Sequence, residues 1–257
     1  MRARPSKRGR GGLMPPGPRH TVRAGMLART QIEPSAAAPP SRLASLWRSH
    51  IGRKALMAVT GLVLVAYVLV HMLANLQAFE GPGPLDRYGA QLRVFPALLW
   101  TARAVLLVSA LVHVVGGIDL WAERRRSRPV GYREWTPSGS TPASRTMIWS
   151  GLLILGFLVY HLLDLTFGVV NPDFRHGQIL HNVVVSFSRA AAVGFYVIAM
   201  AGLGFHLWHG VYSSFSSLGI TNRAFSPGIQ RLAAALATAV AVGFSAVPLA
   251  VLFGLIG

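Results

Sequence analysis

The amino-acid sequence predicts an all-α membrane protein, a bundle of five transmembrane helices. Of its 257 residues, 52% are hydrophobic and only 13% are charged, about half the roughly 25% of charged residues in soluble domains. Five long stretches contain no Asp, Glu, Lys or Arg, and none alternates polar and apolar residues as the strands of a membrane barrel do. The sequence has no cysteine, which excludes disulfide scaffolds, thiolate metal sites, iron–sulfur clusters held by this chain and c-type haem attachment.

Each uncharged stretch predicts one membrane-spanning helix. A span needs about 20 apolar residues, because each residue of a helix rises about 1.5 Å. The stretches reach this length if Arg103 and Asp164 lie near the membrane interfaces, where a long arginine side chain can reach the headgroups. The uncharged stretches are 55–79, 104–118, 146–163, 190–222 and 232–257. The expected helices therefore cover about 52–78, 97–121, 146–169, 189–215 and 230–255.

The N-terminal region is strongly basic. Residues 1–54 contain twelve Lys or Arg and one Glu, which is +11 of the net charge of +17. Residues 1–47 are rich in Arg, Pro, Gly and Ser and show no apolar period, so we expect a disordered basic tail before a membrane domain at 48–257. Such a basic block is also typical of segments that bind nucleic acid. A cytoplasmic flank of a membrane span is the simpler interpretation, and no nucleic-acid partner is expected.

The basic residues also predict the orientation of the bundle. Cytoplasmic loops carry an excess of Lys and Arg. The N-terminal flank and the loops after the second and fourth spans are richer in basic residues than the other two loops. We therefore expect a cytoplasmic N-terminus, an outside C-terminus and a multi-pass location in the plasma membrane. The basic residues of the two cytoplasmic loops are Arg124, Arg125, Arg126, Arg128, Arg133, Arg145, Arg223 and Arg231.

Four of the predicted spans contain histidine, although ionisable residues within a membrane are rare and usually functional. Depth was counted at about 1.5 Å per residue from the cytoplasmic end of each span. His71 then lies roughly 27 Å up and His161 roughly 24 Å up. His113 and His206 both lie roughly 16 Å up. Depth thus predicts an outer pair, His71 with His161, and an inner pair, His113 with His206.

Two facing imidazoles at one depth are suited to ligate one haem iron from both sides, so the two pairs predict two stacked b-type haems. With both axial positions filled, the iron transfers electrons rather than binding oxygen. A proton relay would need acidic partners at several depths, and only Asp119 and Asp164 are available. The alternative from a different class is a histidine-containing transporter without haem.

A second histidine complicates the inner pair. His209 lies one turn nearer the cytoplasm than His206. The matched depth with His113 favours His206 as the ligand, and His209 is then a candidate contact for a haem propionate or a quinone. The chain has no cysteine to hold an iron–sulfur cluster and no glycine-rich nucleotide motif. We therefore expect a partner protein that carries the primary redox centres and binds on the basic side of the bundle. A quinone is the expected mobile carrier in the lipid.

Several short strings accompany this histidine spacing. They are IGRK at 51–54, HMLANL at 71–76, RPVGY at 128–132, SRTMIWSG at 144–151, YHL at 160–162, HNV at 181–183 and HLWHG at 206–210. With the four-histidine spacing, they resemble the cytochrome b membrane-anchor subunit of succinate:quinone oxidoreductase, in its single-subunit, five-helix, two-haem class. The resemblance covers about 46–257.

The resemblance implies a flavoprotein subunit and an iron–sulfur subunit on the cytoplasmic face, where succinate is oxidised. Electrons would pass through the inner and then the outer haem to menaquinone, and this chain would not bind succinate itself. By position, the family's ligands are His71 and His161 for the outer haem and His113 and His206 for the inner haem. Quinol:fumarate reductases share this anatomy. Other b-type quinone cytochromes, such as those of formate dehydrogenases or hydrogenases, are the nearest alternatives.

Four further residues have candidate roles near the haems or the quinone. Asp164 is either a proton acceptor beside an outer quinone or the hydrogen-bonded end of its helix. Arg53, Arg145 and His209 are candidate propionate contacts, and for the two arginines positive-inside anchoring is the alternative.

Overall fold

A computed structural model describes residues 42–127 and 142–257, which belong to one compact unit, Pro40–Gly257. Most of the predicted tail, residues 1–41, and most of the long basic loop, residues 128–141, lie outside the described residues. Within the last part of the expected tail, Arg42–Arg48 forms helix α1.

Five long helices confirm the predicted all-α membrane fold. They are α2 (His50–Leu76), α4 (Pro96–Arg126), α6 (Met147–Leu165), α8 (Ala190–Ser217) and α9 (Ser226–Leu252). Each of them is long and apolar enough to cross a membrane. All regular elements of the described residues are helices. The chain is therefore a multi-pass membrane protein.

The helix ends follow local chemistry. Ser49 caps α2, because its Oγ accepts a hydrogen bond from the Gly52 N–H at 2.9 Å. Proline occupies one of the first two positions of α4 and of α9, where its missing N–H costs nothing. Helix α6 ends at Leu165, four residues before the expected 169, because the chain turns at Gly168, which has a φ of +70°.

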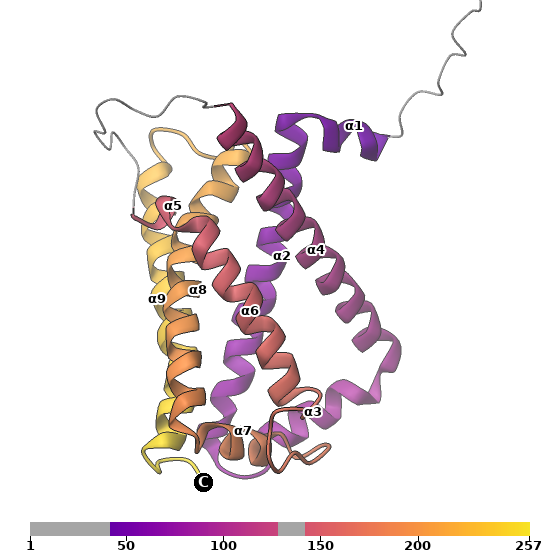
Figure 1. The fold of residues 1–257 in the computed structure, drawn as a ribbon, viewed down its shortest axis with the longest axis vertical. Coiled ribbons are helices and arrows are strands. Elements are labelled where there is room, and N and C mark those ends of the chain that lie inside the picture. Colours follow the sequence, from indigo (N-terminus) through magenta and orange to yellow (C-terminus); the bar gives the residue numbers. More distant parts are fainter. Residues whose placement is uncertain (1–41, 128–141) are drawn as a thin grey trace, which may run out of the picture. The chain divides into compact units, whose positions relative to one another are not determined.

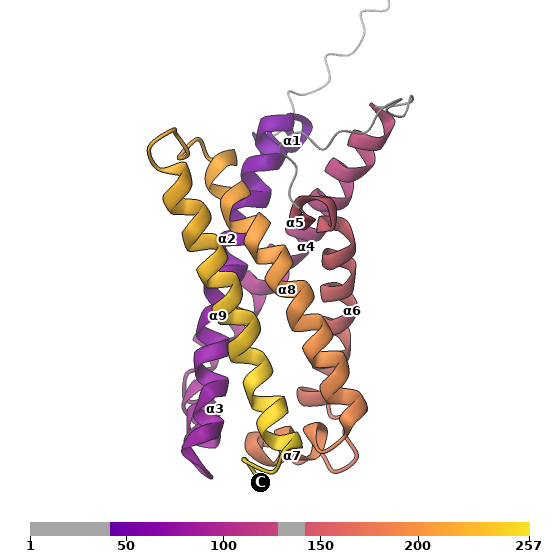
Figure 2. The same ribbon diagram turned by 90° about the vertical axis from the view of Figure 1, so that its left-hand side faces the viewer.

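Four of the long helices form a ring. Helix α2 packs on α4 and on α8, and α6 packs on α8 and, over fewer residues, on α4. The diagonal pairs, α2 with α6 and α4 with α8, are not among the closely packed pairs of the described residues. Helix α9 lies outside the ring against α8 and α2 (Figures 1 and 2). Each of the four helices therefore has one side that faces the interior of the ring.

Short helices lie at the ends of the bundle (Figure 1). Helices α3 (Pro84–Val94) and α7 (Ile179–Phe187) lie at the end that holds the C-terminus, and α2 reaches them through the 3₁₀ helix η1 (Gln77–Glu80). Helices α1 and α5 (Pro142–Arg145) lie at the opposite end. Asp86 of α3 caps α7, because its Oδ1 accepts from the N–H groups of Ile179 at 2.6 Å and Leu180 at 3.0 Å.

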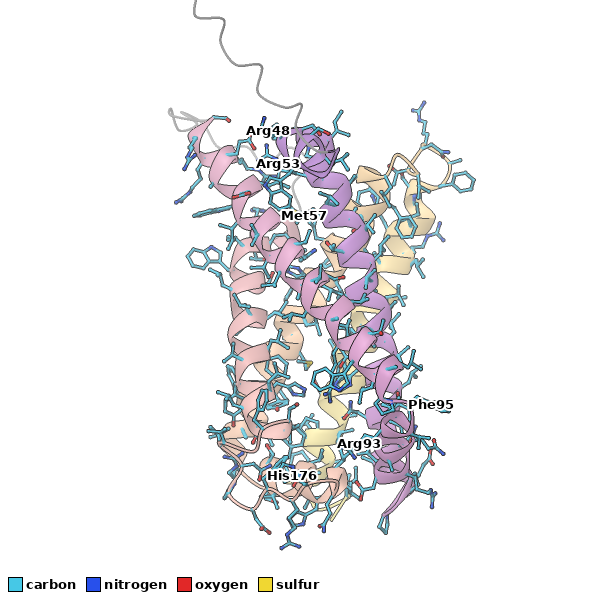
Figure 3. The ribbon with its side chains drawn as sticks, turned by 90° about the vertical axis from the view of Figure 1, so that its right-hand side faces the viewer. Arg48, Arg53, Met57, Arg93, Phe95 and His176 are labelled. Atoms are coloured by element: carbon cyan, nitrogen blue, oxygen red, sulfur yellow. The ribbon has the colours of Figure 1, made fainter. Side chains whose placement is uncertain are left out.

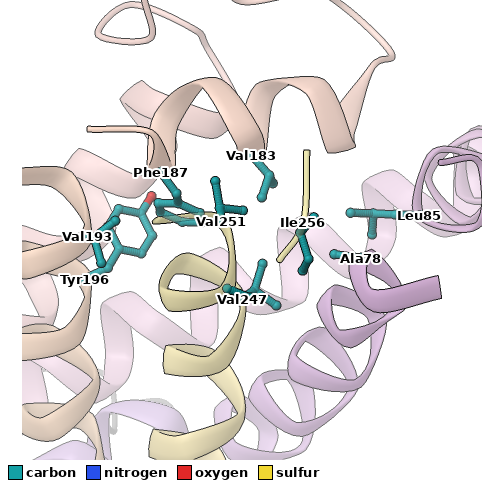
Figure 4. Close-up of a cluster of buried hydrophobic side chains, with 10 residues drawn as sticks. Ala78, Leu85, Val183, Phe187, Val193, Tyr196, Val247, Val251 and Ile256 are labelled. Atoms are coloured by element: carbon teal, nitrogen blue, oxygen red, sulfur yellow. The ribbon is translucent and has the colours of Figure 1, made fainter. Parts of the chain in front are cut away.

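A buried apolar cluster closes the end that carries α3 and α7 (Figure 4). It joins side chains from η1, α3, α7, α8, α9 and the C-terminal segment, so the short helices are packed onto the long ones. Its buried members are Ala78, Leu85, Val183, Phe187, Val193, Tyr196, Val247, Ala250, Val251 and Ile256.

The sides of the bundle are apolar and exposed. Trp100 is 65% exposed, and Leu98 and Trp149 are exposed to a similar extent, as expected of side chains that face lipid. The Arg103 guanidinium lies over the Trp100 ring, 4.9 Å from its centroid. Arg48 and Arg53 lie at one end of the bundle, and Arg93 and His176 lie at the other (Figure 3). The predicted cytoplasmic flank and the predicted outer loops are thus at opposite ends.

Candidate functional site: two imidazole pairs

The four histidines that the depth count singles out meet in two pairs. His71 of α2 faces His161 of α6, with ring centroids 5.9 Å apart and ring planes at 84°. His113 of α4 faces His206 of α8, with ring centroids 6.1 Å apart and ring planes at 63°. Each pair joins helices at diagonal corners of the ring. The imidazoles therefore approach each other across the interior, where the helices that carry them are not closely packed.

These separations fit a metal ion held between two imidazoles. An imidazole nitrogen bonds a metal ion at about 2.0–2.1 Å, so two rings on opposite sides of one ion have centres about 6 Å apart. Edge-to-face packing of two rings without a metal gives centroid distances of about 4.5–7 Å. Distance alone therefore does not separate the two interpretations, and the hydrogen bonds of the rings become decisive.

Both rings of the inner pair are held through Nδ1. The His113 Nδ1 lies 3.3 Å from the Met57 carbonyl oxygen, which can only accept, so this nitrogen carries the hydrogen. The His206 Nδ1 lies 3.2 Å from Ser150 Oγ, and that hydroxyl donates its hydrogen to the Met147 carbonyl at 3.1 Å. The His206 Nδ1 therefore donates as well. In both rings the Nε2 lone pair is left for a metal, as in most histidine metal sites.

Glycines allow the helices to approach the inner imidazoles. A Cβ at Gly61 would lie 3.1 Å from His113 Cε1, and one at Gly151 would lie 3.5 Å from His206 Cε1. The first distance is tighter than ordinary contact, so a side chain at residue 61 would push the His113 ring. Gly151 belongs to the string at 144–151.

The outer pair is held differently on its two sides. The His161 Nδ1 lies 3.2 Å from the Tyr196 hydroxyl, which donates in turn to Asp164 Oδ2 at 3.4 Å. The His71 ring stacks on Tyr67, with centroids 5.4 Å apart and planes at 11°. Its Nε2 lies 3.4 Å from the Asn75 amide nitrogen, which also donates to the His71 carbonyl. Among the described residues, His71 has no oxygen acceptor on its ring.

Asp164 is fully buried, at 0% exposure, and its carboxylate is saturated with donors. Arg189 Nη2 donates to its Oδ1 at 3.0 Å, and the Ser186 and Tyr196 hydroxyls donate to its Oδ2. Of the two expected roles, the structure displays the hydrogen-bonded one. The carboxylate presents no exposed face to a quinone.

The three candidate propionate contacts differ in their surroundings. Arg53 pairs with Glu123 of α4 at 2.6 Å, and its Nε is buried with no hydrogen-bond partner among the described residues. His209 is half-buried, and its ring is not one of those that contact His113. Arg145 is exposed at the end of α5. Arg53 therefore has the environment that best suits an acidic ligand group.

The remaining described histidines lie outside the two pairs. His50 pairs with Glu123 at 2.7 Å, and the His181 Nε2 lies 3.0 Å from the Asp173 carboxylate at the other end of the bundle. Hydrogen bonds from Arg175 hold the pKa of the exposed Asp173 carboxyl below its usual value. These contacts belong to the loops and helix ends.

The residues that orient the imidazoles were not predicted from the sequence. Ser150 precedes Gly151 within a string that was noted, and this was the available signal for it. Tyr196 lies in an uncharged apolar run and has no signal of its own. The contact of His113 with Met57 uses a backbone carbonyl, so the residue type at position 57 does not predict it.

Three of the four rings fit a haem iron through a free Nε2, whereas the His71 Nε2 lies 3.4 Å from the Asn75 amide nitrogen. The inner pair has free Nε2 atoms, close glycines and, at the same end of the bundle, the unpartnered Nε of Arg53. The outer pair has His161 oriented by Tyr196. Comparisons with protein-family models, with curated proteins and with solved structures find no match for this chain.

Proposed function

We propose that this chain is the membrane-anchoring cytochrome b subunit of a succinate:quinone oxidoreductase. In this proposal two b-type haems lie in the ring of α2, α4, α6 and α8 and connect a cytoplasmic flavoprotein and iron–sulfur pair to a quinone, by resemblance menaquinone. The observation that carries it is the meeting of His71 with His161 and of His113 with His206, at 5.9 Å and 6.1 Å, across the diagonals of the ring.

The chemistry of the pairs favours haem over a proton relay or a metal transporter. A haem iron with two imidazole ligands takes up and releases single electrons and has no open position for a substrate. Three of the four rings have Nδ1 fixed on a protein oxygen, which orients the ring and leaves Nε2 available.

The remaining residues of the chain position and insulate the two sites. Each of the four imidazoles is carried by a different helix. The aromatic side chains of Phe157, Phe244 and Tyr196 contact the outer pair. These rings exclude water, which keeps the site apolar. Arg53 offers its unpartnered Nε to an acidic group on the inner side.

The partner proteins would bind at the end that carries α1 and the last turn of α4. That turn contains Arg124, Arg125 and Arg126, and Arg48 ends α1 nearby (Figure 3). A row of positive charges attracts a partner with an acidic face. The excess of positive charge on this side is also what the positive-inside rule expects of the cytoplasm.

Electron donors distinguish this proposal from its nearest alternatives. Membranes containing the full chain and its native partners are given succinate, formate or hydrogen, and haem reduction is followed in the visible spectrum. Reduction by succinate supports the proposal, and reduction by formate or hydrogen alone assigns the chain to another b-type quinone cytochrome. A folded sample without haem contradicts both and supports the transporter.

A further inference from the structure

His161 is the first member of a hydrogen-bonded chain that leads to a buried charge. Its Nδ1 lies 3.2 Å from the Tyr196 hydroxyl, and that hydroxyl lies 3.4 Å from Asp164 Oδ2. Asp164 is fully buried and pairs with Arg189 at 3.0 Å. Asp164 and His161 share one face of α6, three residues apart, and Tyr196 lies on the neighbouring helix α8. The network therefore ties α6 to α8 beside the outer pair.

The direction of each hydrogen bond in this chain follows from the carboxylate. An ionised carboxylate only accepts, and Asp164 also receives bonds from Ser186 and Arg189. The Tyr196 hydroxyl must therefore donate to Asp164. Its lone pairs then face His161, whose Nδ1 must donate. The network allows one tautomer of His161, the one whose Nε2 lone pair is free for a metal.

We propose that Tyr196 and Asp164 are positioning residues for His161, and that this anionic relay makes His161 a stronger electron donor and lowers the reduction potential of the outer haem. The inference rests on the proposed function. A carboxylate behind a metal-bound histidine raises the basicity of that ligand, and the hydrogen bonds of axial ligands are one of the means by which proteins tune haem. A more basic ligand favours the ferric state.

The inner pair lacks such a relay and serves as an internal reference. Its acceptors are the Met57 carbonyl and the Ser150 hydroxyl, which are neutral. The outer relay is also dry, because Tyr196 is 5% exposed and its ring is packed by Phe157 and Phe187, with centroids 4.9 Å and 4.7 Å away. Hydrogen bonds act more strongly in such an environment than in water.

The Tyr196→Phe substitution tests the relay without changing any charge. Membranes with the full chain and its partners are titrated electrochemically, and the outer haem is identified as the one lost in His161→Ala. We expect the equilibrium constant for reduction of the outer haem to rise about tenfold, which is about 59 mV for a one-electron couple. The potential of the inner haem should not change.

Tyr160→Phe is the matched control. The Tyr160 ring also contacts Tyr196, with centroids 6.1 Å apart, but the partner of the His161 Nδ1 is the Tyr196 hydroxyl. The control should leave both potentials unchanged. An unchanged outer potential in Tyr196→Phe, or an equal shift of both haems, overturns the inference.

Asp164→Asn provides a second test that does not depend on Tyr196→Phe folding. The amide keeps the size of the side chain, and Arg189 keeps its bonds to the Val170 and Ser186 carbonyls. The outer potential should rise here as well, and an unchanged value contradicts the relay. If the wild-type membranes hold no haem, the proposed function itself fails. If both haems are present but neither variant shifts the outer one, only the relay fails.

Discussion

His113 and His206 face each other with ring centroids 6.1 Å apart, although α4 and α8 occupy diagonal corners of the helix ring. Side chains from helices that pack closely would meet in any bundle. A meeting across the diagonal needs both rings to point into the same interior space. A hydrogen bond from each Nδ1 fixes both rings in that direction. The His71 and His161 pair repeats the arrangement on the other diagonal.

The two pairs predict that the haems are lost independently. His71→Ala or His161→Ala should remove the outer haem and leave the inner one, because in the proposed function each substitution removes one of the two histidines that hold a single iron. Haem per polypeptide should fall from about two to about one, as measured from the visible spectrum of the purified complex. Loss of both haems from an assembled complex would contradict the separate pairs.

His206, rather than His209, should be the ligand opposite His113. His206→Ala should abolish the inner haem, whereas His209→Ala should retain both haems, because only the His206 ring contacts His113. The same haem count measures this. Retention of the inner haem in His206→Ala together with its loss in His209→Ala would assign the ligand to His209.

A side chain at Gly61 should disturb the inner pair. Gly61→Val places a Cβ about 3.1 Å from His113 Cε1, so the imidazole must shift from its position opposite His206. We expect inner-haem content to fall several-fold, while outer-haem content is kept. Gly156→Val is the matched control, since no heavy atom beyond its chain neighbours and its own helix backbone lies within 4 Å of a Cβ at that position. Equal haem content in the two variants would argue against a site at His113.

The buried carboxylate of Asp164 should stabilise the fold. Asp164→Ala removes the carboxylate that Arg189 Nη2 and two hydroxyls bind, which should cost on the order of 3 kcal/mol of unfolding free energy. Thermal unfolding in detergent measures the change as a lowered Tm. Asp173→Ala, which breaks an exposed pair with Arg175, is the control and should leave Tm unchanged. Equal Tm values for the two variants would contradict a structural role for Asp164.

The sequence was sufficient to predict the five spans and the partners within each imidazole pair. Charge-free runs identify helices in a membrane, and the fixed rise of a helix converts a residue count into depth. His71 and His161, counted from different loops, arrive at similar depths and meet in the structure. Both steps need one coordinate only, the position along the membrane normal.

The rotation of each helix about its axis and the shape of the loops could not be predicted from residue counts and charge-free runs. Whether Tyr196 faces His161 depends on how α8 turns about its axis, which a depth count does not contain. The short helix α3, which begins at Pro84 between the first two spans, was not expected from the sequence. Ser150 could orient His206 only once α6 and α8 were packed together.

The most direct measurement is the haem content of the purified chain with its co-purifying partners, taken from a reduced-minus-oxidised visible spectrum. Two imidazole pairs predict two b-type haems per polypeptide, with the bands of six-coordinate iron and at least partial reduction by succinate. A folded, assembled sample that contains no haem would contradict the account. The four histidines of the interior would then be packing or transport residues.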